Sequence, residues 1–117
     1  MKKDKKLFRY LCEAFPYYLL VEWEGGIHSI ESINCYDEVQ LIGYNYTVPY
    51  YEIKPYLRSM DSMTSEEYDE LCKYASSKFI GDSKEREWLI INHFDYMGLI
   101  PLGLAVEIND NNNPYKK

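Results

Sequence analysis

The sequence lacks the features that identify membrane, exported and phosphate-binding proteins. No apolar run approaches the roughly 20 residues that a membrane-spanning helix needs. The basic start of the chain is not followed by an apolar stretch, because Arg9 interrupts Leu7-Phe8, and no export signal is expected. The chain has only six glycines, and none of them forms a phosphate-cradling loop after a strand. These absences predict a soluble, cytoplasmic protein that does not bind a membrane.

Cysteine and histidine are also scarce. The cysteines Cys12, Cys35 and Cys72 are odd in number and widely spaced, which fits neither a secreted disulfide framework nor a zinc site. We therefore expect reduced and mostly buried thiols. The two histidines, His28 and His93, come without a third metal ligand at a suitable spacing. The sequence thus predicts no metal site and no cofactor.

Charge is distributed unevenly along the chain. Residues 1–9 carry a net charge of +4, and Lys116 and Lys117 add two more positive charges. Because the whole chain carries −6, the body between these ends, residues 10–115, carries −12. Such a body is repelled by nucleic acid phosphates and attracted to a basic surface on another protein. A protein partner is therefore expected, and nucleic acid is not.

The first half of the chain predicts one helix and two hairpins. Apolar residues recur at helical spacing over residues 4–14, and Pro16 ends the pattern. The segments that follow alternate between two faces and are rich in aromatic and β-branched residues, as strands are. Gly25-Gly26 supplies the first hairpin turn, and Tyr44-Asn45 lies at or near the second. The predicted strands are residues 17–24, 27–33, 39–43 and 46–51.

A longer helix is the clearest element of the second half. Thr64 and Glu67 form a capping box at its start, and Gly81 marks its end. Its apolar stripe consists of Tyr68, Leu71, Cys72, Ala75 and Phe79. Before it, Pro55 is placed to begin a short helical turn over residues 53–57.

A second helix and a last strand complete the expected order. The helix begins at Asp82 or Ser83, includes His93, and stops at Gly98. Residues 99–108 are apolar and β-like, and we expect them to rejoin the sheet.

This order of elements predicts an α+β fold. An N-terminal helix precedes an antiparallel meander of about four strands, and two helices and one C-terminal strand follow. Residues 1–117 are expected to form a single domain, because the length is typical of one domain and no interior linker is visible. Residues 1–6 and 109–117 are polar and are expected to be flexible tails.

Two segments carry a family resemblance. They are residues 54–64, KPYLRSMDSMT, and residues 93–105, HFDYMGLIPLGLA. Together they resemble a family of small uncharacterised proteins encoded by phages and prophages of Bacteroidetes. This chain departs from the family pattern of Pro at 59, Ser at 61 and Arg at 97, so any role of an arginine at position 97 does not carry over. The resemblance implies an origin in a mobile element or gut bacterium and no particular activity.

Tyrosine is the compositional outlier, with 13 of 117 residues. Tyrosine is favoured in sheets and at protein interfaces, because its ring is apolar and its tip is polar. A core cannot provide partners for so many hydroxyl groups, so some tyrosines between residues 44 and 56 are expected to be exposed. The alternative is that the sheet carries tyrosines on its solvent-exposed face without contacting a partner. The tyrosines predicted to contact a partner are Tyr44, Tyr46, Tyr50 and Tyr56.

The acidic body and the tyrosines predict a non-enzymatic protein-interaction domain. Homo-oligomerisation through the tyrosine-rich sheet is compatible with this prediction. A sharper version is an inhibitor whose carboxylates occupy the nucleic-acid-binding surface of a host protein. The predicted contact acids are Asp61, Glu66, Glu67, Asp69 and Glu70. Arg58 belongs to the same region, either as part of a basic–aromatic cluster with Lys54 and Tyr56 or as a cation that balances the acidic helix start.

The alternative function is a small-molecule binder or enzyme that uses His93 and Asp95. These residue types run acid–base chemistry, although two positions apart on a helix they do not face each other. The alternative structural roles are a cap of the following turn for Asp95 and a backbone hydrogen bond for His93. Nucleic acid binding by the lysine-rich start is the third and weakest class.

Overall fold

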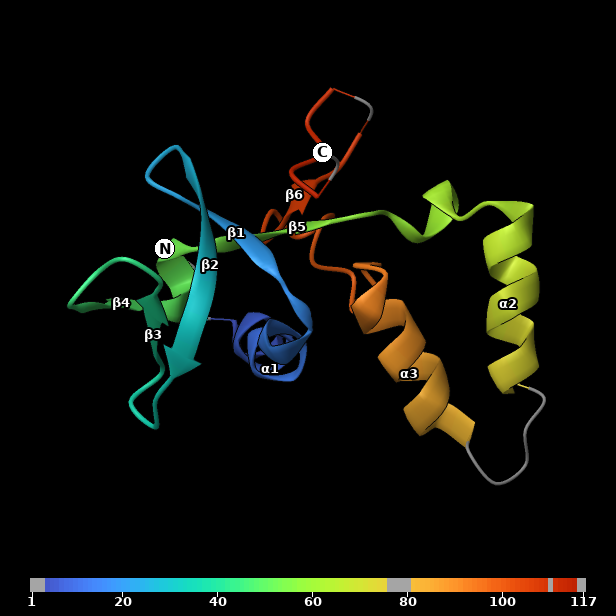
Figure 1. Ribbon diagram of the computed structural model, residues 1–117, viewed down its shortest axis with the longest axis horizontal. Helices are drawn as coiled ribbons and strands as arrows, with labels where there is room; N and C mark the ends of the chain where they lie inside the picture. The colour runs from blue at the N-terminus through green and yellow to red at the C-terminus, as the bar shows by residue number, and fades with distance from the viewer. Residues whose placement is uncertain (1–3, 76–80, 110, 116–117) are drawn as a thin grey trace.

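A mostly antiparallel six-stranded sheet forms the centre of the protein (Figure 1). The computed structural model describes residues 4–75, 81–109 and 111–115. The strands within these residues are β1 (Leu20–Trp23), β2 (Gly26–Ile33), β3 (Glu38–Leu41), β4 (Thr47–Pro49), β5 (Lys54–Leu57) and β6 (Val106–Glu107). They are ordered β4-β3-β2-β1-β5-β6, and β5 and β6 alone pair in parallel. The predicted mixed fold with a mainly antiparallel sheet is confirmed, but the described residues form six strands instead of five.

The helices lie to one side of this sheet. They are α1 (Lys5–Ala14), α2 (Ser65–Ala75) and α3 (Gly81–Ile91), with 3-10 turns η1 (Phe15–Tyr17), η2 (Tyr50–Glu52) and η3 (Met60–Ser62). Figure 1 shows α1 against the sheet, α3 beside α1, and α2 beyond α3. Between α1 and the sheet lies the main core, which includes Leu7, Tyr10, Leu11, Ala14, Val21, Ile30, Val39, Leu41, Ile53 and Leu57.

Helix α1 follows the sequence prediction closely. The Asp4 side chain caps it by accepting a hydrogen bond from the Lys6 backbone N–H at 2.9 Å. The buried residues recur at positions 7, 10, 11 and 14, which place one apolar stripe against the sheet. The helix continues directly into η1, where Pro16 stands.

The first strand begins later than predicted, at Leu20 instead of residue 17. Residues 15–17 form η1, and Tyr18 has a left-handed backbone with φ of 62°. The hairpin turn is also shifted by one residue, because Glu24 (φ 50°) and Gly25 (φ 78°) form it and Gly26 already belongs to β2. Two successive positive φ angles are what a type I′ turn requires.

The prediction of a helical turn over residues 53–57 is wrong, because Lys54–Leu57 is strand β5 between β1 and β6. Proline disfavours a helical conformation for the residue before it, which keeps Lys54 extended. Ile53, Pro55 and Leu57 are buried while Lys54 is exposed, which is the alternation of a strand.

Helix α2 starts as predicted but differs at its end and in its packing. The capping box is present: the Glu67 backbone N–H donates to Thr64 Oγ1 at 3.1 Å, and Thr64 N–H donates to Glu67 Oε1 at 2.9 Å. However, Gly81 lies in α3 instead of ending α2, which the structure describes as far as Ala75. The predicted apolar stripe is wrong at Tyr68 and Cys72, which are exposed, and Phe79 lies outside the described residues.

The region after α3 is more irregular than predicted. Asp82 and Ser83 lie inside α3, and His93 lies beyond its end with a left-handed φ of 63°. The segment 99–108 does return to the sheet, but only Val106–Glu107 forms a strand. The rest of the segment consists largely of turns, which Asp95 caps by accepting hydrogen bonds from the N–H groups of Leu99 and Ile100.

The type I′ turn yields a stability prediction. A positive φ is sterically unfavourable for glutamate and much less so for asparagine. Glu24→Asn should therefore stabilise the fold by about 0.5–1 kcal/mol. Chemical denaturation measures this difference. Glu24→Gln removes the same charge and keeps the penalty, and it should leave stability unchanged; an equal gain in both variants would contradict the backbone explanation.

Candidate functional site

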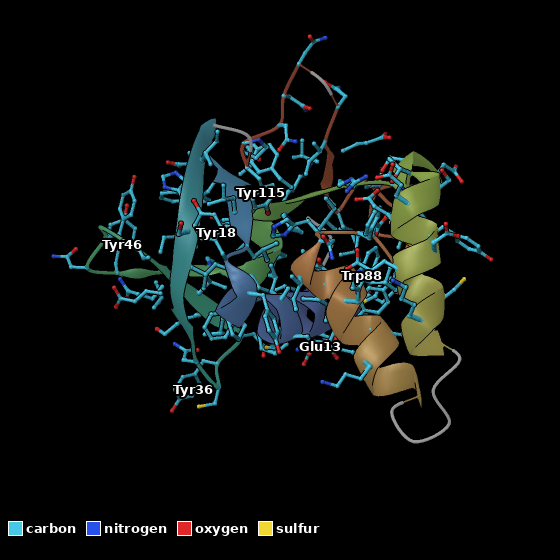
Figure 2. All side chains as sticks on the ribbon, turned by 45° about the vertical axis from the view of Figure 1, so that its right-hand side comes forward. Glu13, Tyr18, Tyr36, Tyr46, Trp88 and Tyr115 are labelled. Atoms are coloured by element: carbon cyan, nitrogen blue, oxygen red, sulfur yellow. The ribbon has the colours of Figure 1, made fainter. Side chains whose placement is uncertain are left out.

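The residues predicted to contact a partner do not form one surface. Asp61 and the acids of α2 lie at one end of the molecule, whereas Tyr46 lies at the opposite end, beside β4 (Figures 1 and 2). The molecule measures 43 Å along its longest axis. The acidic and the tyrosine parts of the prediction therefore describe two separate surfaces.

Arg58 and Glu67 connect α2 to the sheet. The Arg58 guanidinium donates two hydrogen bonds to the Glu67 carboxylate, at 2.7 and 2.8 Å, and a third to the backbone oxygen of Ser62 at 3.1 Å. It also lies over the ring of Phe94, 4.3 Å from the centroid. These hydrogen bonds from Arg58 lower the pKa of Glu67 to about 2. Arg58 is thus half-buried and paired with Glu67 at the start of the helix.

Glu70 is the second acid that holds α2 in place. Its carboxylate accepts a hydrogen bond from the indole Nε1–H of Trp88 at 2.9 Å. Next to it, the half-buried Leu71 packs against the small apolar cluster of Trp88, Leu89 and Phe94. Glu67, Glu70 and Leu71 are three and four positions apart, so they share one face of the helix and turn it toward the protein.

The opposite face of α2 is exposed. We define the outer face of α2 as Glu66, Tyr68, Asp69 and Cys72, all of which are exposed to solvent. Tyr68 is 59% exposed, and a hydrogen bond with the Cys72 thiol raises the pKa of its phenol. Asp61 in η3 and Met60 beside it are exposed as well. The outer face therefore combines exposed carboxylates with a large aromatic ring.

Tyr44 and Tyr46 belong to an aromatic cluster that the sequence did not predict. Their rings meet those of Trp23 and His28 edge to face, with centroid distances between 5.4 and 6.4 Å. Trp23 is buried, while Tyr46 at the rim is 52% exposed. The register that places Trp23 opposite Gly26 and Val21 opposite His28 brings these rings to one face.

Tyr50 and Tyr56, the other two tyrosines predicted to contact a partner, are less exposed than the prediction assumed. Tyr50 is only 2% exposed and packs against Phe8 and Tyr51, so its ring belongs to the core. Tyr56 is half-buried, and its backbone oxygen accepts a hydrogen bond from the hydroxyl of Tyr115.

His93 and Asp95 have different neighbours. Both carboxylate oxygens of Asp95 are used by backbone N–H groups, those of Leu99 at 2.7 Å and Ile100 at 2.8 Å. The imidazole of His93 stacks on Tyr115, with centroids 3.7 Å apart and planes within 10°. Burial, together with the nearby positive charge of Arg58, lowers the pKa of His93 to about 4.

Tyr115 and the three cysteines differ from what the sequence predicts. Tyr115 lies in the segment expected to be a flexible tail, and nothing in its polar surroundings in the sequence indicates a contact. The prediction of mostly buried thiols is wrong, because Cys12, Cys35 and Cys72 are all exposed and free. Within the described residues, no three side chains of His, Cys, Asp or Glu are grouped so that they could hold a metal ion. In the same residues, no helix has the length and apolar character needed to cross a bilayer.

Comparison with known proteins gives no match: no family model fits the chain, and no significantly similar curated protein or solved structure was found.

The half-buried imidazole of His93 makes the stability of the fold depend on pH. An unfolded histidine has a pKa near 6.5, whereas folding lowers it to about 4. The unfolded chain therefore binds a proton first, and stability should fall between pH 6.5 and 4, with a slope of up to about 1.4 kcal/mol per pH unit.

Denaturation at a series of pH values measures this slope. His93→Asn tolerates the left-handed backbone and should flatten the profile between pH 6.5 and 5, above the range of most carboxylates. His28→Asn is the matched control and should leave the slope in place. An unchanged slope in His93→Asn would show that another group causes it.

Proposed function

We propose that this chain is a non-enzymatic protein-interaction domain that binds a basic surface of another protein through the outer face of α2. The observation that carries the proposal is the orientation of the helix. Two of its carboxylates and its half-buried leucine face inward, while Glu66, Asp69 and the ring of Tyr68 face outward. A helix that only completed the core would turn its aromatic side chain inward.

Charge complementarity favours a basic partner. The body of the chain carries −12, and residues 61–73 contain five acids against one lysine. The electrostatic field of these negative charges accelerates association with a positively charged surface and disfavours binding to acidic proteins. The affinity of such a complex depends mainly on a few side chains that are fully buried in the interface, and tyrosine is among the residues that most often have this role. Tyr68, which is exposed next to Asp69 on α2, has this chemistry.

The proposal extends to the role of an inhibitor. Carboxylates on an exposed helix can occupy a surface that otherwise binds the phosphates of a nucleic acid, because both present closely spaced negative charge. The resemblance of residues 54–64 and 93–105 to phage and prophage proteins supports a host nucleic-acid-binding protein as the target and a cytoplasmic place of action.

A capture experiment with charge-matched variants tests the proposal. The double variant Glu66→Lys/Asp69→Lys changes the net charge by four units, and so does the control Glu31→Lys/Glu52→Lys, whose residues are exposed elsewhere. Wild type and control should retain the same basic protein from a host lysate, and the α2 variant should bind it at least 10-fold more weakly.

The measured quantity is the dissociation constant of the captured protein for each variant at physiological salt. Equal losses in both double variants would reduce the effect to net charge. Unchanged binding in the α2 variant would exclude the outer face of α2 as the contact surface. Each variant is first shown to unfold at the same temperature as the wild type.

A further inference from the structure

The side chain of Tyr115 bridges the neighbouring strands β1 and β5 at a position where their own pairing has stopped. Its hydroxyl accepts a hydrogen bond from the Leu20 backbone N–H at 2.9 Å. The same hydroxyl has one proton to donate, and it lies within hydrogen-bond distance of two acceptors, the backbone oxygen of Tyr56 at 3.1 Å and that of Leu20 at 3.3 Å. The side chain thus joins β1 to β5 from a position 95 residues away from Leu20.

The pairing of β1 and β5 explains why this place is open. The two strands pair only through Val21 with Pro55 and Glu22 with Lys54. Pro55 has no N–H group to donate, and the ladder does not continue to Leu20 and Tyr56. The backbone groups left there need one partner that both accepts and donates, which a phenol does and a phenyl ring does not. We call this place, lined by Leu20, Tyr56, His93 and Tyr18, the tyrosine slot.

The walls of the tyrosine slot fit a flat aromatic ring. The imidazole of His93 stacks on one face of Tyr115, and Tyr18 meets it edge to face at 6.2 Å. Burial raises the pKa of the Tyr115 phenol, which keeps its proton available for donation. The slot therefore recognises both the ring and the hydroxyl of a tyrosine.

The segment that carries Tyr115 is otherwise held by polar turns. Asn109 accepts hydrogen bonds from the N–H groups of residues 111 and 112, and Asn113 accepts one from Tyr115. Beside it, a shallow groove of about 260 Å³ is lined by Ile27, Tyr56 and residues 111–114. The segment therefore has a single anchoring side chain, Tyr115, at the end of an asparagine-rich stretch. A segment held in this way resembles a bound peptide that can dissociate from its site.

We propose that the tyrosine slot is a peptide-binding site that the chain fills with its own C-terminal segment, and that it accepts the same segment from a second copy of the chain. Exchange of identical elements between copies creates the same contacts twice, so it requires little additional free energy. The ligand chemistry is given by the present occupant, a tyrosine at the end of a turn. Lys116 and Lys117, which follow this tyrosine in the sequence, are attracted to the acidic body of another copy.

Peptide binding to the full chain with Tyr115→Ala tests the proposal. The probe is a synthetic peptide with the sequence of residues 109–117, and its dissociation constant is measured by calorimetry. The peptide should bind the variant and raise its unfolding temperature, whereas wild type, whose slot is filled, should bind it at least 10-fold more weakly. A peptide with phenylalanine in place of tyrosine should bind the variant about 10-fold more weakly, because the hydroxyl contacts are missing.

The controls make each outcome decisive. Tyr36→Ala removes a tyrosine that is 80% exposed, and this variant should not gain affinity for the peptide. If Tyr115→Ala does not fold alone, the peptide should restore its circular dichroism spectrum. A folded variant that ignores the peptide, an unfolded one that the peptide does not restore, or equal affinity for the phenylalanine peptide would overturn the slot as a tyrosine site.

The role of a second copy is tested by sedimentation at increasing protein concentration. Wild type should form a dimer at high concentration that Tyr115→Ala does not form. A wild type that stays monomeric throughout, or a dimer that persists in the variant, would overturn the exchange between copies.

Discussion

The placement of α2 and α3 relative to the sheet depends on Arg58. Its backbone extends the edge of β5, because its N–H donates to the His93 oxygen at 2.7 Å and its oxygen accepts from Asp95 N–H at 2.8 Å. Its side chain lies over Phe94 and binds both oxygens of Glu67. One residue therefore fixes the start of α2 and the end of α3 relative to the sheet. An arginine is suited to this position, since only its planar fork binds a carboxylate through two parallel hydrogen bonds.

This attachment determines which face of α2 meets solvent. Because Glu67 binds Arg58 and Glu70 binds Trp88, these two carboxylates turn toward the protein, and Tyr68 turns outward. Glu67 is half-buried and paired with Arg58, and Glu70 is exposed but accepts from Trp88, whereas Glu66 and Asp69 are exposed. Two exposed carboxylates and an aromatic ring are thereby presented on a helix whose other side is attached to the rest of the fold.

The parts of the fold that local chemistry determines could be predicted from the sequence. The stripe of α1 and the capping box of Thr64 and Glu67 need only neighbours within one or two helical turns. The face of α2 could not be predicted, because the partners of its carboxylates lie 9 and 18 residues away in the sequence. Pro55 fitted both a helical turn and a strand, and only pairing with β1 decides between them. The contact of Tyr115 with Leu20 spans 95 residues and left no pattern in the polar tail.

Amide hydrogen exchange of α2 in Arg58→Met tests most directly whether Arg58 holds this helix. Methionine keeps the apolar stem over Phe94 and removes the guanidinium, and Lys54→Met, at an exposed lysine on the same strand, is the control. The account predicts that the amides of α2 exchange at least 10-fold faster in Arg58→Met than in wild type, while those of α1 and of the β1–β2 hairpin keep their rates. Unchanged exchange in α2, or an equal acceleration throughout the sheet, would contradict it.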